Sequence, residues 1–344
     1  RAYFDDTRRS GGAQEVPMAS RLRRRKRSPW LVTLLLLFIL IGLCYAVVRV
    51  YFRAPEQKTG DSVMIQRVNT PAVSEDLSDE EAEALRSHYE RKPGFWTILV
   101  SEADDENGGT DTNILVAVDT ENGYVFGASI ARDTKAFING KNHKINFAYN
   151  AGGMELLSQT VSGQLGIPVD YTVLVDLRAF QALVDAVGGV DFYIPIDMDY
   201  EDPYQDLSIH FSKGMRHLNG AEALKVVRCR NGYASQDIGR MQTQQDFLKA
   251  VAKKMLTPAS LTKLDDYCKI FLEYVETDLT VGNLVWLGGS VAAMGTEKID
   301  FATLPGDWKS PYIYLKQEEV LAMVNQYLNP YTEDRTAEDL NILT

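Results

Sequence analysis

Cysteine and histidine are scarce in this 344-residue chain, which has three Cys and four His. Neither Cys229 nor Cys268 sits in a metal-ligand or redox spacing. A disulfide between them stays open in an oxidising compartment, although the missing signature favours two unpaired thiols. The histidines show no HExxH or similar ligand pattern, and no Ser/His/Asp or Cys/His arrangement appears. The sequence therefore gives no sign of a zinc centre or of covalent nucleophilic catalysis.

An excess of positive charge is found only at one end of the chain. The net charge is −11, yet residues 1–28 hold nine Lys or Arg against three acidic residues, a balance of +6 that leaves −17 for the remainder. A remainder this acidic is a poor non-specific binder of nucleic acid, so no nucleic-acid partner is expected. The basic stretch has few aliphatic residues and is predicted to be a disordered tail.

Long apolar runs are absent except for residues 29–48, twenty residues without a charge. That is enough for one helix across a hydrocarbon core of about 30 Å. A cleaved signal peptide would have a shorter apolar region and a small-residue cleavage site, whereas Arg49–Arg53 is aromatic and basic. Six positive residues precede the run and two follow it, which predicts a cytoplasmic N-terminus and a single-pass transmembrane helix.

The part beyond the membrane reads as a linker at 49–75, one folded domain at 76–330 and a C-terminal tail at 331–344. Apolar runs alternate with amphipathic segments, so we expect a single layered α-β-α domain with a mixed β-sheet flanked by helices. Strands are expected at 96–101, 113–118, 124–130, 171–175, 190–194 and 298–304. Helices are expected at 78–89, 154–165, 177–187, 220–227, 238–255, 261–275, 281–293 and 317–327.

Polar chemistry concentrates in residues 219–253. Asn219 and Glu222 have capping-box spacing, which predicts a short helix that ends just before Arg228 and Arg230. A second helix begins at Asp237, which the pattern favours as its N-cap. Its Asp237, Arg240 and Gln244 fall at i, i+3 and i+7 on one face. Arginines near a helix N-terminus suit phosphate oxygens, although pairing with surface carboxylates is an equally good explanation of the composition.

Carboxylates gather between the first two strands. Asp104 and Asp105 come after the first, and Asp111 opens the second. Mg²⁺ in proteins is commonly bound by one or two carboxylates together with phosphate oxygens of a substrate. An acidic loop of this kind is, however, more often a solvated turn. After the third strand comes Arg132-Asp133, which can be an ion pair or an anion site. Asn146 is expected to anchor a loop or cap a helix.

These motifs occur in an order that resembles the LytR-CpsA-Psr family of cell-wall glycopolymer ligases. They are GGTDTNILVAVD, SIARDTKAFI, HKINFAYNAGG, VDYTVLVDLRAFQALVDAVGGVDFYIP, LNGAEALKVVRCR, DIGRMQTQQDFLKAV and the final LPGDW and YIYLKQEEV. The resemblance covers residues 95–328. The loop before Asp111 is more acidic here than in the family pattern.

The resemblance implies an enzyme and its site. It assigns catalysis to Asp111, Arg132, Arg228, Arg230, Asp237 and Arg240, substrate binding to the four arginines and Gln244, and a Mg²⁺ or Mn²⁺ ion to Asp104 and Asp111. The implied reaction is a phosphotransfer of a glycopolymer such as teichoic acid or capsule from a polyprenyl pyrophosphate carrier to peptidoglycan. The implied location is the outer face of the cell membrane in a Gram-positive type of envelope. The alternative function is a non-catalytic envelope sensor that binds polyprenyl pyrophosphate lipids.

Overall fold

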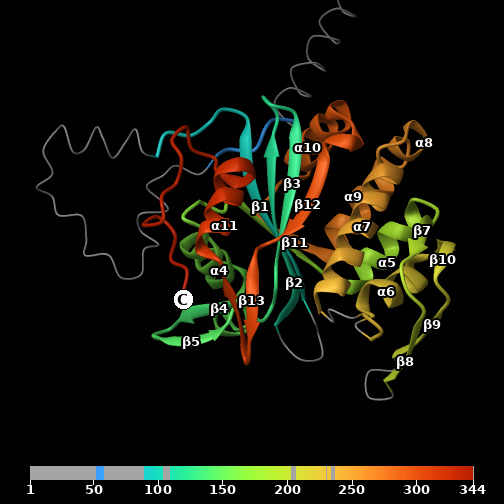
Figure 1. Cartoon of the computed structure of the whole chain (residues 1–344). Coiled ribbons are helices and arrows are strands. Elements are labelled where there is room, and N and C mark those ends of the chain that lie inside the picture. The colour runs from blue at the N-terminus through green and yellow to red at the C-terminus, as the bar shows by residue number, and fades with distance from the viewer. Residues whose placement is uncertain are drawn as a thin grey trace, which may run out of the picture. The chain divides into compact units, whose positions relative to one another are not determined.

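The computed structural model describes residues 52–57, 89–103, 109–202, 207–229, 231–233 and 237–343 (Figure 1). The chain divides into residues 1–51 and 52–344, and the second unit is the one described below. The predicted basic tail, the predicted membrane span and almost all of the helix expected at 78–89 lie outside the described residues. Among the residues that are described, no helix has both the length and the apolarity needed to cross a bilayer.

A six-stranded mixed sheet forms the centre of this unit (Figure 1). Its strands, in order across the sheet, are β11 (Val275–Thr277), β6 (Tyr171–Val175), β1 (Phe95–Ala103), β2 (Thr110–Asp119), β3 (Tyr124–Ile130) and β12 (Ile299–Thr303). Strands β1, β2 and β3 run antiparallel as two consecutive hairpins, and β6 and β12 add in parallel on either side. The expected mixed sheet flanked by helices is confirmed.

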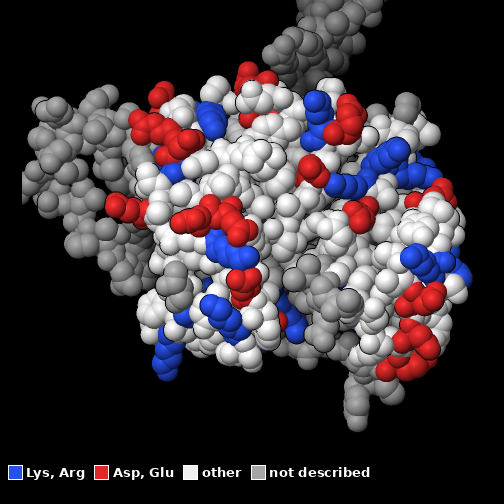
Figure 2. All heavy atoms as spheres, in the orientation of Figure 1, with Lys and Arg blue, Asp and Glu red and all other residues white. Residues whose placement is uncertain are grey.

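Beside the sheet, three helices pack with short strands around a second apolar cluster. The helices are α5 (Leu177–Ala186), α6 (Gly220–Arg228) and α7 (Asp237–Met255), and the strands are β7 (Val190–Ile194), β8 (Met198–Asp202), β9 (Leu207–Phe211) and β10 (Gly214–Leu218). Figure 2 shows acidic residues gathered over the β8–β9 region. Asp199 and Glu201 there each contact a ring nitrogen of His210. Cys229, in the cluster, and Cys268 are both free thiols.

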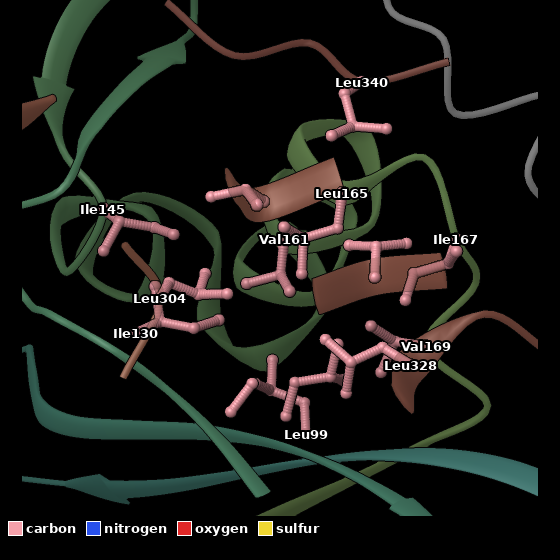
Figure 3. Close-up of a cluster of buried hydrophobic side chains, with 14 of the residues drawn as sticks. Leu99, Ile130, Ile145, Val161, Leu165, Ile167, Val169, Leu304, Leu328 and Leu340 are labelled. Atoms are coloured by element: carbon pink, nitrogen blue, oxygen red, sulfur yellow. The ribbon is translucent and has the colours of Figure 1, made fainter. Parts of the chain in front are cut away.

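Period-two alternation in the strands explains why helices cover both faces of the sheet. Phe95, Leu99 and Leu115 point into one cluster with the helix α4 (Phe147–Leu165). Figure 3 shows part of this cluster, in which Val161 and Leu165 of α4 lie near Leu99, Leu328 and Leu340. Trp96, Ile98 and Val118 point the other way, toward the helix α10 (Val281–Met294).

The structure also contains elements that the sequence pattern did not predict. They are β4 (Lys135–Ile138), β5 (Lys141–Lys144), β8, β9, β10, β11, β13 (Gly306–Lys309), β14 (Tyr312–Leu315) and the short helix α8 (Pro258–Leu261). The helix expected at 261–275 is α9 (Leu264–Tyr274), and the strand β11 follows it directly. The helix expected to begin at 154 begins seven residues earlier and is kinked at Gly152 and Gly153, where the backbone leaves helical geometry. The last helix is α11 (Gln317–Met323), followed by a π-helical turn at Val324–Leu328.

The predicted start of α6 is confirmed, with a complete capping box between Asn219 and Glu222. The next residue, Gly220, lies against the backbone of α5, and a β-carbon there would overlap the carbonyl group of Gln181. Its amide N–H donates to Asp185 Oδ1 over 2.7 Å. The close approach of α6 to α5 therefore requires glycine at this position.

We predict that Gly220→Ala lowers the free energy of unfolding by about 1–3 kcal/mol, because a backbone carbonyl cannot turn aside as a side chain can. Gly163→Ala in α4 is the matched control, since a β-carbon there has no atom within 4 Å. It should leave stability unchanged or raise it by up to about 1 kcal/mol through helix propensity. Urea denaturation of the full chain in detergent, followed by tryptophan fluorescence, measures both. Equal stability of the two variants would contradict the close α5–α6 contact at Gly220.

Candidate anion-binding site

The register of β2 against β3 builds the centre of the site. Asn113 pairs with Ile130, so continuing the antiparallel register by two residues places Asp111 opposite Arg132. Arg132 Nη1 donates to Asp111 Oδ1 over 2.5 Å. The side chain of Arg132 is 30% exposed and that of Asp111 is 23% exposed. The pair therefore lies at the surface, where it can contact a ligand.

Helix α7 brings a second guanidinium group to the same carboxylate. Arg240 Nη1 lies 3.8 Å from Asp111 Oδ2, and its side chain is only 4% exposed. The helix is held to the sheet by buried Gln245, whose amide donates to Ser129 at the end of β3 and to Thr303 at the end of β12. A guanidinium group this buried needs anionic or hydrogen-bonding partners, which makes Arg240 a fixed part of the site.

Gln244 ties α7 both to the sheet and to the end of α6. Its amide donates to the Val227 carbonyl over 3.1 Å and to Thr112 Oγ1 over 3.4 Å. Val227 comes directly before Arg228, the last residue of α6. Gln244 therefore places the exit of α6 beside the start of β2.

Glu102 is a member of the site that the sequence reasoning missed. It lies opposite Thr112 in the β1–β2 pair and accepts a hydrogen bond of 2.7 Å from the Thr112 hydroxyl group. Burial raises the pKa of Glu102 and the Asp111 charge raises it further, while the Thr112 hydrogen bond and the charges of Arg240 and Arg228 lower it. The charge of Arg228 therefore reaches the Glu102 carboxylate, as the charge of Arg240 does. The only available signal was the position of Glu102 at the end of the first strand.

Several predicted residues are less fully placed. Asp104 and Arg230 lie outside the described residues, and only the backbone of Asp237, at the start of α7, is described. The remaining predicted residues, Asp111, Arg132, Arg240, Gln244 and Arg228, converge as described above.

Asp133, the neighbour of Arg132, pairs more closely with Lys144 than with Arg132. Asp133 Oδ1 lies 2.7 Å from Lys144 Nζ but 3.9 Å from Arg132 Nε. Asp133 is therefore mainly a partner of Lys144, and Arg132 is oriented by Asp111.

The metal expected from the sequence depends on Asp111 and Asp104. Among the described residues, no group of three or more His, Cys, Asp or Glu side chains could hold a metal ion. Mg²⁺ needs only one or two carboxylates when substrate phosphates complete its shell. Asp111 fits such a ligand, because its carboxylate is partly exposed and has Glu102 nearby.

Taken together, the site holds two guanidinium groups against one carboxylate, with a third arginine at the end of α6. A planar guanidinium fork binds phosphate or carboxylate oxygens through two parallel hydrogen bonds. The geometry therefore suits an anionic ligand with several oxygens, which would compete with Asp111 for Arg132.

Comparison with known proteins identifies relatives of the chain. The LytR_cpsA_psr family matches residues 62–331. The polyisoprenyl-teichoic acid–peptidoglycan teichoic acid transferase TagV of Bacillus subtilis is 33% identical over 206 residues, which cover 58% of this chain and 53% of that protein. The transferase TagU of Bacillus cereus, with the same descriptive name, is 34% identical over 221 residues, covering 64% of this chain and 70% of that protein. The match thus spans about half the length of the first relative.

The fold is also similar to solved structures. The crystal structure of B. subtilis TagV aligns with a TM-score of 0.60 at 29% identity, covering 70% of this chain and 100% of that chain. The crystal structure of B. subtilis TagU aligns with a TM-score of 0.51 at 26% identity, covering 70% of this chain and 99% of that chain. The family resemblance seen in the ordered motifs is confirmed. With a family match that takes in most of its length and the shared fold, this chain belongs to the LytR-CpsA-Psr family.

Proposed function

We propose that the chain is a membrane-anchored phosphotransferase that moves an anionic glycopolymer, of teichoic-acid or capsule type, from a polyprenyl pyrophosphate carrier to peptidoglycan. The observation that carries the proposal is the placement of Arg132 and Arg240 on one partly exposed carboxylate, Asp111, where three chain segments meet. The names of the TagV and TagU relatives, both teichoic acid transferases, support the polymer and the acceptor.

In this proposal the arginines hold the diphosphate of the donor. Arg132, Arg228, Arg230 and Arg240 bind its oxygens and stabilise the charge that develops as phosphorus is attacked. An acceptor hydroxyl group forms the new P–O bond, the bond to the carrier phosphate breaks, and the hydroxyl proton passes to a carboxylate. Asp111 and Asp237 are the two candidates for that base. Positioning and electrostatics are enough for such a transfer, which needs no covalent intermediate.

Asp111 and Asp104 would hold a Mg²⁺ or Mn²⁺ ion together with phosphate oxygens. Such an ion, when bound, would neutralise charge that develops on the leaving carrier phosphate. Arg132, which pairs with Asp111, would bind the diphosphate oxygens beside this carboxylate.

A sensor that binds polyprenyl pyrophosphate without turnover is the second candidate. It would need the same arginines, but it would have no need of a carboxylate base beside the phosphate. The presence of Asp111 at the centre of the cluster favours the enzyme. Turnover in a reconstituted transfer reaction separates the two functions.

We expect Arg132→Ala, Arg228→Ala and Arg230→Ala each to lower transfer by about 100- to 1000-fold, the usual effect of removing one electrostatic group of a transition state. Replacement by Lys should rescue poorly, because an ammonium group cannot make two parallel hydrogen bonds. Melting temperature should change little, because Arg132 is partly exposed and its ion pair is worth about 0–1 kcal/mol. Arg240 is left out of this test, since its burial makes loss of folding the first consequence of replacement.

Arg178→Ala is the control for this set. Arg178 pairs with Asp176 at the start of α5, and its side chain is 70% exposed. It should transfer at the wild-type rate. Transfer and thermal melting are measured on the same preparations. If the three site variants match Arg178→Ala in rate, the arginines do not bind the diphosphate as proposed.

The metal is tested with Asp111→Asn. The substitution removes a ligand charge but keeps the shape of the side chain, so half-maximal transfer should require more Mg²⁺ than in the wild type, or the residual rate should lose its dependence on metal. Transfer is measured across a Mg²⁺ series, with EDTA-treated protein as the zero point. An unchanged Mg²⁺ requirement at wild-type rate would rule out Asp111 as a ligand.

The anchor is tested on cells. With residues 29–48 spanning the membrane and the basic tail inside, protease added to intact, wall-stripped cells should degrade the folded domain and leave an N-terminal fragment of roughly fifty residues that the membrane protects. Immunoblotting with tags at the two ends reads this out. A folded domain that survives until the cells are lysed would overturn the outside location and the proposed function with it.

A further inference from the structure

Residues 53–57 belong to the expected linker, yet they are fixed on the folded domain. Trp96, near the start of β1, donates from its ring N–H to the Pro55 carbonyl over 3.0 Å. The hydroxyl group of Tyr171, the first residue of β6, donates to the Glu56 carbonyl over 2.8 Å. The chain therefore enters the domain at the end of the sheet where β1 and β6 begin.

Helix α10 lies at the same end of the sheet. The side-chain amide of Asn283, in its first turn, donates to the Arg53 carbonyl over 3.0 Å. After α10 a 3-10 turn leads into β12, whose first residue pairs with Val125 near the start of β3. Strands β1 and β3 run in the same direction, because each is antiparallel to β2. Figure 1 accordingly shows α10 at one end of the sheet, at the top of the view.

The composition of α10 is unusual for this domain. It reads VGNLVWLGGSVAAM, fourteen residues without a charge. Every other described helix of seven residues or more contains at least one charged residue. Fourteen residues are too few to cross a bilayer. A helix that is apolar on all sides is normally buried on all sides.

Only one side of α10 is covered by the domain. The residues that pack on the apolar cluster against the sheet are Leu284, Leu287, Val291 and Met294. The residues at helical spacing on the opposite side are Val285, Gly289, Ala292 and Ala293. Gly289 and Ala293 are exposed, and a β-carbon at Gly289 would have no described atom within 4 Å. This outer side is thus apolar and not covered by the described part of the chain.

The length of the chain before Arg53 limits how far this side can lie from a membrane. The expected membrane span ends at residue 48, five residues before Arg53. Five residues reach at most about 18 Å when fully extended. The headgroup layer takes up roughly 5–8 Å of that distance on each side of the hydrocarbon core. So short a tether keeps the α10 end of the sheet next to the bilayer that holds the span.

We propose that the outer side of α10 rests on this lipid bilayer, at the boundary between headgroups and acyl chains. The inference rests on the membrane anchor of the proposed function, and it adds the orientation of the domain. Contact with lipid removes Val285 and its apolar neighbours from water. Trp286, whose ring meets that of Trp96 edge to face, is of the residue type that is enriched at this depth.

This orientation has a consequence for the anion-binding site. Glu102 of that site lies six residues beyond Trp96 on β1, a distance of about 20 Å along the strand. The site is therefore at the end of the sheet that points away from the bilayer. Docking through α10 holds it toward the cell wall.

The proposal is tested with nitroxide labels on the full chain in vesicles of phosphatidylglycerol and phosphatidylcholine. Cys44, Cys229 and Cys268 are replaced by Ala, and Gly289→Cys or Ala293→Cys supplies the single thiol. Electron paramagnetic resonance then measures collisions with oxygen, which concentrates in lipid, and with a nickel chelate, which stays in water. Melting temperature is checked for each variant, and two labelled positions give an answer even if one variant unfolds.

Lys141→Cys is the control, since Lys141 is exposed on β5, at the opposite end of the domain in Figure 1. We expect the ratio of oxygen to nickel collisions at both α10 positions to be several-fold higher than at Lys141→Cys. Equal ratios would overturn the docking. So would a label on α10 that is shielded from both reagents and whose spectrum sharpens when unlabelled chain is added, because a second copy would then cover the helix.

A chain that keeps Cys44 as its single cysteine tests the anchor separately. Cys44 lies inside the expected span, so its label should collide with oxygen and not with nickel. If Cys44 is in lipid while both α10 labels are in water, the docking is wrong and the anchor stands. If the Cys44 label collides with nickel as often as the Lys141→Cys label, the anchor is wrong and the docking is wrong with it.

Discussion

The Asp111 carboxylate, held between Arg132 and Arg240, is the interaction on which the site depends. It joins β2 to the end of β3 and joins both to α7. Glu102 belongs to the same cluster, because the charge of Asp111 raises its pKa and the charge of Arg240 lowers it. In the absence of a ligand the arginines and carboxylate neutralise one another, which lets so much charge collect at the ends of buried strands.

Helix α7 makes this arrangement rigid because it belongs to both halves of the described unit. Gln245 fastens it to β3 and β12, while Phe247 and Val251 fill the apolar cluster of α5 and α6. Arg240 and Gln244 stand on the same helix, so their positions follow from packing on both sides. A site built on a helix and on strand ends keeps its geometry better than one built on loops alone.

The long regular elements were predictable from the sequence, since period-two and amphipathic patterns reflect burial on one side. The strands at 124–130, 171–175 and 190–194 were predicted with the observed bounds. The short hairpins were missed for a physical reason. Strand β5 reads KNHK and has no buried residue, so its pairing with β4 leaves no apolar pattern. Strand β11 is three residues long and directly continues a helix.

Some residues of the candidate site were predictable from the sequence, and others were not. The arginines and Asp111 were predictable because ordered motifs resemble a family, not because their spacing shows that they meet. Glu102 was missed because one acidic residue at a strand end has no pattern of its own; only its register with Thr112 brings it to the site. The expected helix cap at Asn146 is not formed, because its side chain makes no cap hydrogen bond at the start of α4.

By itself the sequence determined the order of the long strands and helices, the separation of a basic apolar N-terminus from an acidic domain, and the residue types able to bind a diphosphate. These depend on local patterns of charge and hydrophobicity, which each segment carries in its own residues. Only the tertiary structure decided that Asp111 faces Arg132, that Arg240 is buried beside them and that Arg53 lies beside α10. Those are contacts between segments far apart in the chain, and they follow from strand register and helix packing, which no single segment contains.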